Sequence, residues 1–178
     1  MRFIRNFLVL SLMLLGVTAA GVSAQTPTTP LERKVFKEIS TLPNYGVFDH
    51  IAFQVEGSTV TLFGRVWDGR NRSQAERFVK KLPGVTSVDN RIEILPASGF
   101  DNAIRRELVR TLVRNGALGR YLMEPRPEMR LIVENGRVTL EGYVSTRGDY
   151  NLANILANGV PGVFEVKNNL IIGKEAFR

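Results

Sequence analysis

Two short segments of the chain, 51–56 and 60–66, alternate hydrophobic residues with polar or small ones, and each predicts a strand with one buried face. The pair Gly57-Ser58 separates them and suits a two-residue hairpin turn, because Gly tolerates the positive φ that such turns need. A third segment, 88–94, predicts another strand. Together these segments indicate a small sheet.

Two other segments place their apolar residues at helical spacing. Residues 31–39 form an amphipathic pattern that Pro43 stops. A second helix is predicted from about Ser73 to Leu82, where Pro83-Gly84 ends it. The predicted elements therefore follow the order α-β-β-α-β.

The whole pattern occurs twice. The stretch 60–66, Val-Thr-Leu-Phe-Gly-Arg-Val, returns at 138–144 as Val-Thr-Leu-Glu-Gly-Tyr-Val, displaced by 78 positions without a gap. Between Val55 and Ile94 the two copies share 14 identical residues over 40 positions, which indicates a tandem repeat of one module. A right-handed crossover between the second and third strands places both helices on one face. Each copy therefore predicts an α+β fold with a three-stranded mixed sheet.

The repeat also suggests boundaries. We expect a first domain at 31–96, a linker at 97–100 and a second domain at 101–174, each near the size at which one core is only marginally stable. The second domain is expected to start near Asp101, acting as a helix cap. It should differ from the first mainly by a longer connection at 116–128.

Gly64 and Gly142 occupy the core-facing phase of their strands. Since glycine weakens a strand, its presence in both copies suggests a helix that approaches too closely for a Cβ. Gly84 and Gly162 follow the second helix of each copy. We interpret all four glycines as structural residues.

The first 24 residues are typical of an export signal. Arg2 and Arg5 precede the apolar run 7–15, and Val22-Ser23-Ala24 suits cleavage before Gln25. The run is short for a membrane span, although an uncleaved anchor stays an alternative. No Cys follows the cleavage point, which excludes a lipid-modified N-terminus. Residues 25–30 should form a flexible leader, and the mature chain is expected in the periplasm, either free or peripheral at a membrane.

Composition narrows the chemistry further. The chain has no Cys and a single His, His50, so neither a thiolate metal site nor a His cluster is expected. Its carboxylates are scattered, without a pair spaced for acid–base work, and we predict a non-enzymatic protein without metal or cofactor. Without the two Arg of the signal, the 24 Lys and Arg become 22, against 17 Asp and Glu. Export argues against nucleic acid as the partner, and the mild positive excess then points to anionic phospholipid or other envelope polyanions.

Arg106, Arg110 and Arg114 recur every four residues and line one face of a predicted helix. This stripe is either a solvated charged face or a binding site for anionic headgroups, worth about 1 kcal/mol per Arg. Membrane attachment of this kind would be weak and reversible.

Two further surfaces are suggested by differences between the copies. Phe63, Arg65 and Trp67 lie on the sheet face away from the helices, and form either a contact surface or the packing between the two modules. Leu152 and Ile155 replace polar residues of the first copy on the second helix. This change suggests packing between modules, self-association into a homo-oligomer, or membrane contact.

The motifs Val-Thr-Leu-x-Gly-x-Val (60–66 and 138–144) and Pro-Gly-Val-x-x-Val-x-Asn (83–90 and 161–168) resemble those of the BON domain family (bacterial OsmY and nodulation). The first-copy turn Gly57-Ser58 departs from the Asn-Gly that is more typical there. The resemblance covers nearly the whole mature chain and matches Gly64 and Gly142 to the hallmark glycine of the family. It implies the α-β-β-α-β fold, an envelope location, no catalysis, and attachment to phospholipid membranes.

We therefore expect an exported envelope protein that binds anionic phospholipid membranes weakly and acts in envelope maintenance or osmotic stress protection. The alternative is a protein-interaction or chaperone-like module that binds envelope proteins, as an oligomer. High salt should weaken the first kind of binding and leave the second intact.

Overall fold

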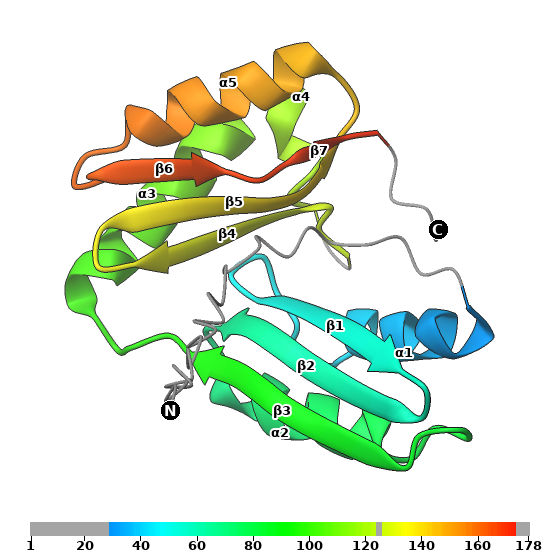
Figure 1. Ribbon diagram of the computed structural model, residues 1–178. Coiled ribbons are helices and arrows are strands. Elements are labelled where there is room, and N and C mark those ends of the chain that lie inside the picture. Colours follow the sequence, from blue (N-terminus) through cyan, green and yellow to red (C-terminus); the bar gives the residue numbers. More distant parts are fainter. Residues whose placement is uncertain (1–28, 124–125, 174–178) are drawn as a thin grey trace, which may run out of the picture.

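A computed structural model of the chain describes residues 29–123 and 126–173, which form two α+β modules in tandem (Figure 1). The predicted signal peptide lies outside the described residues. The first module consists of α1 (Pro30–Ser40), β1 (His50–Glu56), β2 (Thr59–Val66), α2 (Gly69–Val79) and β3 (Ser87–Ile94). The second consists of α3 (Gly99–Arg114), α4 (Gly116–Gly119), β4 (Met129–Glu134), β5 (Arg137–Val144), α5 (Arg147–Asn158), β6 (Glu165–Asn168) and β7 (Ile171–Ile172).

The two sheets have the same topology. In the first, β1 pairs antiparallel with β2 and β3 pairs parallel with β2. In the second, β4 pairs antiparallel with β5, and both β6 and β7 pair parallel with β5. β6 and β7 together take the place of β3, with an interruption at residues 169–170. The registers also agree, since Val60 lies opposite Val88 and Val138 opposite Val166. The predicted fold class is confirmed.

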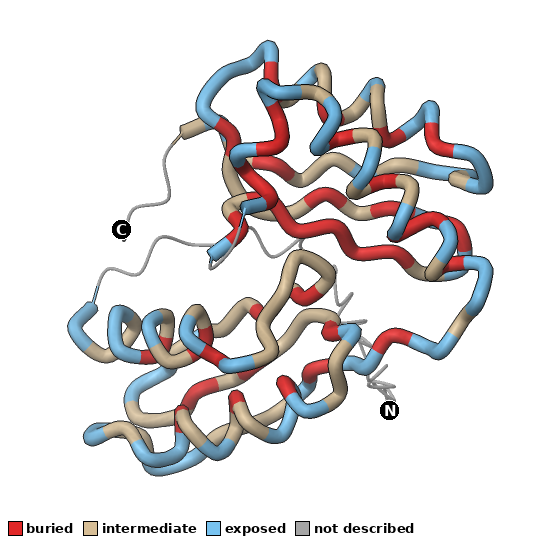
Figure 2. Tube along the Cα trace, turned by 180° about the vertical axis from the view of Figure 1, so that it is seen from behind, coloured by how far each residue is buried: buried red, intermediate tan, exposed pale blue. Residues whose placement is uncertain are grey.

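Each module has its own hydrophobic core between its sheet and its helices (Figure 2). The first contains Val60, Leu62 and Val66 of β2, all fully buried, beneath Val35 of α1 and Val79 of α2. The second contains their counterparts on β5, beneath Leu108 and Leu112 of α3 and Ala153 of α5. The alternation read from the sequence therefore assigns the core face of each central strand correctly.

The first helix of each module begins earlier in the chain than the sequence predicted. The Thr29 side chain caps α1 and forms a capping box with Glu32, and Pro30 occupies the first turn. Pro30 thus belongs to the helix and not to a leader. Ser98 caps α3 by accepting a hydrogen bond from the amide of Asp101, so Asp101 is not the cap, and residues 99–100 assigned to the linker are helical.

The second helix of the first module also begins earlier than predicted. The Asp68 carboxylate caps it, and α2 runs from Gly69 to Val79 instead of 73–82. The prediction relied on the periodic apolar residues, the first of which is Ala75, and therefore missed the polar first turn of the helix. Asn71 in that turn is fully buried and donates to the backbone carbonyl of Asn44.

Gly64 and Gly142 are structural, but the predicted reason was wrong. Gly64 has φ +121° and Gly142 has φ +102°, which side chains rarely adopt. A Cβ at Gly64 would collide with the carbonyl oxygen of His50, and one at Gly142 with that of Glu128. The close approach therefore comes from the neighbouring strand and the residue preceding it, not from a helix.

The longer connection of the second module is structured where the coordinates describe it. It contains the single turn α4, whose Leu118 is fully buried in the second core. Tyr121 follows and is also buried, and its hydroxyl accepts hydrogen bonds from the Ser145 amide and Arg120 and donates to Asp149.

Candidate functional site

The predicted arginine stripe lies on the outer surface of α3. Arg106, Arg110 and Arg114 are exposed, because the opposite face of the helix buries Ile104, Leu108 and Leu112. Arg110 forms an ion pair with Glu107 one turn away, whereas Arg106 and Arg114 form no ion pair within the described part of the chain. Two of the three guanidinium groups are therefore available to an external anion.

An exposed aromatic pair lies at the N-terminal end of the same helix. Phe100 in the first turn of α3 stacks on Phe164 in the loop before β6, with ring centroids 5.9 Å apart and planes at 27°. Phe100 is 50% exposed and Phe164 76% exposed. The sequence analysis missed this pair, although Phe164 replaces Thr86 of the first copy in an otherwise matched loop. Together with the exposed Val113, the pair makes the face of α3 both basic and apolar.

The two replacements on α5 have different environments. Leu152 is half-buried and packs against the core of its own module, while Ile155 is 66% exposed. Figure 1 shows α5 on the side of the second module that faces away from the first. Inter-module packing, one of the three explanations given for this pair, therefore does not account for the exposed Ile155. Ile155 adds apolar surface to the layer that α3 and α5 form.

Buried polar groups hold α3 on its sheet. The Asp101 carboxylate accepts hydrogen bonds of 2.9 and 2.8 Å from the amides of Asn135 and Gly136, in the turn between β4 and β5. Arg105 is also buried and donates to the Val133 carbonyl and to the Asn102 side chain. Burial lowers the pKa of Arg105, while the charges of Asp101 and Asp49 act against that change. The helix is thus fixed in orientation beneath its exposed stripe.

Arg65 and Trp67 contact the second module, which favours the packing alternative for this predicted surface. Arg65 forms ion pairs with Glu93 of its own sheet, at 3.2 Å, and with Glu134 of β4, at 3.4 Å. The Trp67 ring packs edge-on against Phe48, and the guanidinium of Arg105 lies 6.0 Å from its centroid. Phe63 lines the groove between the two sheets.

The centre of the interface is formed by residues that the sequence analysis did not identify. The guanidinium of Arg130 on β4 donates to the Gly46 carbonyl at 3.0 Å and lies 4.5 Å from the ring centroid of Tyr45. The backbone amide of Leu131 donates to the Val47 carbonyl at 2.7 Å. A loop of the first module therefore covers the exposed edge of β4, which prevents that edge from pairing with other chains.

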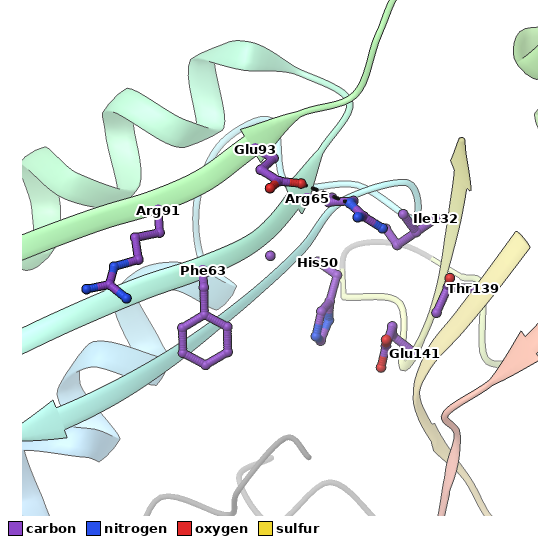
Figure 3. Close-up of a pocket in the computed structure, with 9 residues that line it drawn as sticks. His50, Phe63, Arg65, Arg91, Glu93, Ile132, Thr139 and Glu141 are labelled. Atoms are coloured by element: carbon purple, nitrogen blue, oxygen red, sulfur yellow. Dashed lines mark hydrogen bonds and ion pairs between the residues drawn. The ribbon is translucent and has the colours of Figure 1, made fainter. Parts of the chain in front are cut away.

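A groove of about 270 Å³ lies between the open faces of the two sheets (Figure 3). His50, Phe63 and Arg65 line it from the first module, with Ile132 and Glu141 from the second. Burial, aided by the charge of Arg130, lowers the pKa of His50 to about 4. Burial raises the pKa of Glu141, although the Asn169 side chain donates to it at 2.7 Å. Partners inside the protein already engage most charged groups of the groove.

The structure offers little for metal or membrane-spanning roles in the ranges that it describes. In residues 29–123 and 126–173, His, Asp and Glu do not gather in groups of three that could hold a metal ion. Within the same ranges, every helix is too short or too polar to cross a bilayer. The Asp149 carboxylate accepts hydrogen bonds from Arg120, Tyr121 and Thr146 and has a structural role. Partial burial raises its pKa, but bonds from Thr146 and Tyr121 and the Arg120 charge hold that pKa below its usual value.

Comparisons with known proteins identify a similar curated protein and similar solved structures. Osmotically-inducible protein Y of Escherichia coli (strain K12) is 24% identical over 192 residues, which cover 90% of this chain and 92% of that protein. Two solved structures of CdsD, a structural protein of the Type III secretion system of Chlamydia trachomatis, are similar at 15% identity and a TM-score of 0.29. The alignments cover 80% of this chain and 91% of the first structure, and 82% of this chain and 98% of the second, which is a C-terminal domain.

The BON domain family matches residues 28–96 and 100–174, which is one match per module and most of the chain. The repeated motifs, including Gly64 and Gly142, lie inside these two matches. The chain therefore belongs to the BON domain family, with two BON domains in tandem.

Proposed function

We propose that this chain is a non-enzymatic binding protein of the bacterial envelope that attaches weakly and reversibly to anionic phospholipid membranes through the outer face of α3. The observation that carries the proposal is the combination of three exposed Arg with an exposed, stacked Phe pair at one end of the same helix. Interfacial binding needs both electrostatic attraction and burial of apolar area, and this surface provides both.

The expected affinity follows from these residues. Arg106, Arg110 and Arg114 contribute about 1 kcal/mol each beside an anionic bilayer. Phe100 and Phe164 are partly covered already, so inserting each of them adds roughly 1 to 2 kcal/mol. The sum, about 5 to 7 kcal/mol, corresponds to a Kd between roughly 10 µM and 0.2 mM. The attachment is therefore peripheral and readily reversed.

The location and the biological context are part of the proposal. The N-terminal sequence supports export to the periplasm with cleavage after Ala24. The similarity to osmotically-inducible protein Y supports a role in the response to osmotic stress. A weak membrane ligand suits such a role, because the membrane is then not saturated and the amount bound rises with the amount of protein present.

Flotation with vesicles tests the proposal. Residues 25–178, which contain both BON domains, would be mixed with phosphatidylglycerol or phosphatidylcholine vesicles at low and high salt. The variant Arg106→Gln, Arg110→Gln, Arg114→Gln should bind phosphatidylglycerol roughly 100-fold more weakly, since about 3 kcal/mol is removed. The matched control Arg77→Gln, Lys80→Gln, Lys81→Gln removes the same net charge from α2 and should bind normally. Equal loss in both variants would contradict the assigned site.

The second candidate function is a protein-interaction module that uses the exposed apolar residues. Ile155, Phe164 and Met123 are all more than half exposed on the second module, and a surface of this kind also suits a protein partner or self-association. High salt separates the candidates, because it weakens headgroup binding and leaves apolar contacts intact. If Phe100→Ser with Phe164→Ser abolishes an oligomer and leaves flotation unchanged, the second function is favoured.

A further inference from the structure

We propose that the helix layer of the first module carries a second binding surface, the basic end, formed by Lys34, Lys37, Arg77, Lys80 and Lys81. The ligand that fits it is a linear polyanion with repeated phosphate groups. This inference is independent of membrane attachment through α3, since it concerns other residues, another module and another ligand.

The fold places these residues on neighbouring segments, namely α1, α2 and the turn that follows α2. The side chain of Leu31 lies 3.9 Å from where a Cβ of Gly84 would stand, so the first turn of α1 meets the segment that follows α2. Val35 and Ile39 bury the inner face of α1, and Ala75 and Val79 bury that of α2. All five cations are exposed, with Lys34 and Lys37 on α1, Arg77 on α2, and Lys80 and Lys81 directly after the end of α2.

The basic end has few internal partners. Within the residues that the structure describes, Lys34, Lys37, Lys80 and Lys81 form no ion pair, and Arg77 contacts only the ring of Phe78, at 5.2 Å. Arg70, on the same helix, differs because it is held by Asp68 at 2.6 Å. The positive charge of the five residues is therefore directed at solvent and at whatever binds there.

Comparison of the two modules shows that the fold does not require this charge. Arg77, Lys80 and Lys81 correspond to Ile155, Asn158 and Gly159 in the second module. The first turns correspond as well, because Phe100 lies beside Gly162 as Leu31 lies beside Gly84. On this alignment Lys34 becomes Ala103, and only Lys37 keeps a cation, as Arg106. At these equivalent positions, one framework thus presents five cations in the first module and mostly uncharged side chains in the second.

The same comparison favours a polymer over a bilayer. Binding to a membrane interface requires apolar side chains that can be inserted, and α1 and α2 expose no large hydrophobic residue among those described, since Trp67 and Ile94 lie elsewhere. Long flexible cations without fixed partners suit a chain of phosphates, which can adjust to them one group at a time. Such binding releases counterions and is strongly dependent on salt.

Calorimetric titration with long-chain inorganic polyphosphate tests the inference, using residues 25–178 and the same two triple variants. Arg77→Gln, Lys80→Gln, Lys81→Gln should weaken binding roughly 10- to 100-fold at 0.1 M salt and lower the slope of log K against log salt by about 2. The triple Gln variant of α3 carries the same net charge and should bind within about 2-fold of the unchanged chain.

The outcomes separate clearly. Equal weakening in both variants would show that net charge alone attracts the polymer, and would overturn the basic end as a site. Binding that is unchanged in the α2 variant, or undetectable in the unchanged chain, would also overturn it. The variant with Lys80→Arg and Lys81→Arg keeps the charges and should bind normally, which would show that binding requires the charges, and equal urea unfolding of the Gln variant and the unchanged chain would show that the Gln variant is folded. The vesicle flotation experiment has no bearing on this test, because it concerns α3 and a different ligand.

Discussion

Acidification should destabilise this protein through His50. The residue starts β1 and faces the groove between the two modules (Figure 3). Burial first, and the positive charge of Arg130 second, lower its pKa from 6.5 to about 4. The imidazole is therefore neutral in the folded chain at a pH where it is charged in the unfolded chain.

The sign and size of the change in unfolding free energy follow from this difference in pKa. Between pH 6.5 and about pH 4 the unfolded chain binds a proton that the folded chain does not, so the unfolding free energy falls as the pH falls. The stability that comes from keeping His50 neutral is fully present above pH 6.5 and is lost below about pH 4. A shift of this size is worth at most about 3 kcal/mol, and we expect roughly 1 to 3 kcal/mol because the side chain is only half-buried.

Urea unfolding at pH 7.5, 5.5 and 4.5 provides the assay, with Trp67 as the single tryptophan reporter. The difference in unfolding free energy between the unchanged chain and His50→Gln should change by 1 to 3 kcal/mol across these pH values. The pH-dependent contributions of the carboxylates that both proteins contain cancel in that difference. Glu141 has a raised pKa, so it acts in the opposite direction, and repeating the comparison with Glu141→Gln controls for it. Parallel pH profiles for the two proteins would refute the argument.

Three further predictions concern the framework. Gly142→Ala should destabilise by about 3 kcal/mol or more in urea unfolding, because of its positive φ and the blocked Cβ position, whereas Gly116→Ala, which meets no neighbour, should change little. Tyr121→Phe should cost about 1 to 3 kcal/mol by the same measurement, because a buried amide and a carboxylate lose their partner. A double-mutant cycle on Arg65 and Glu134 should give a coupling of roughly 0.2 to 1 kcal/mol between the modules; zero coupling would show that this ion pair does not stabilise the interface.

The elements that bury apolar residues at regular spacing could be predicted from the sequence. The alternation in β2 and β5 gives the core face correctly, since Val60 and Leu62, like Val138 and Leu140, are buried. The boundaries that depend on polar caps could not be predicted as well. Asp68 and Ser98 start their helices from positions where the hydrophobic pattern carries no signal.

The contacts between the modules could not be predicted for another reason. The loop that presents Gly46 and Val47 meets Arg130 and Leu131 across a separation of 84 positions along the chain. Neither partner has a distinctive local pattern, because a backbone carbonyl is available at every residue. Arg65 and Trp67 were recognisable as a surface, but choosing between a free surface and an interface required the relative placement of the two domains.

The tandem repeat provides the physical basis for separating fold from function in this chain. Residues that both copies share, such as Leu62 with Leu140 and Gly64 with Gly142, are buried or conformationally restricted, so the framework accounts for them. Some positions where the copies differ on the helix layer, such as Arg77 with Ile155, are exposed in both modules. Since such exchanges leave the fold intact, packing cannot be the reason for either residue. Two copies with equivalent cores and different outer faces are expected when one framework carries two binding surfaces, which is why the α2 and α3 variants are informative only when they are measured together.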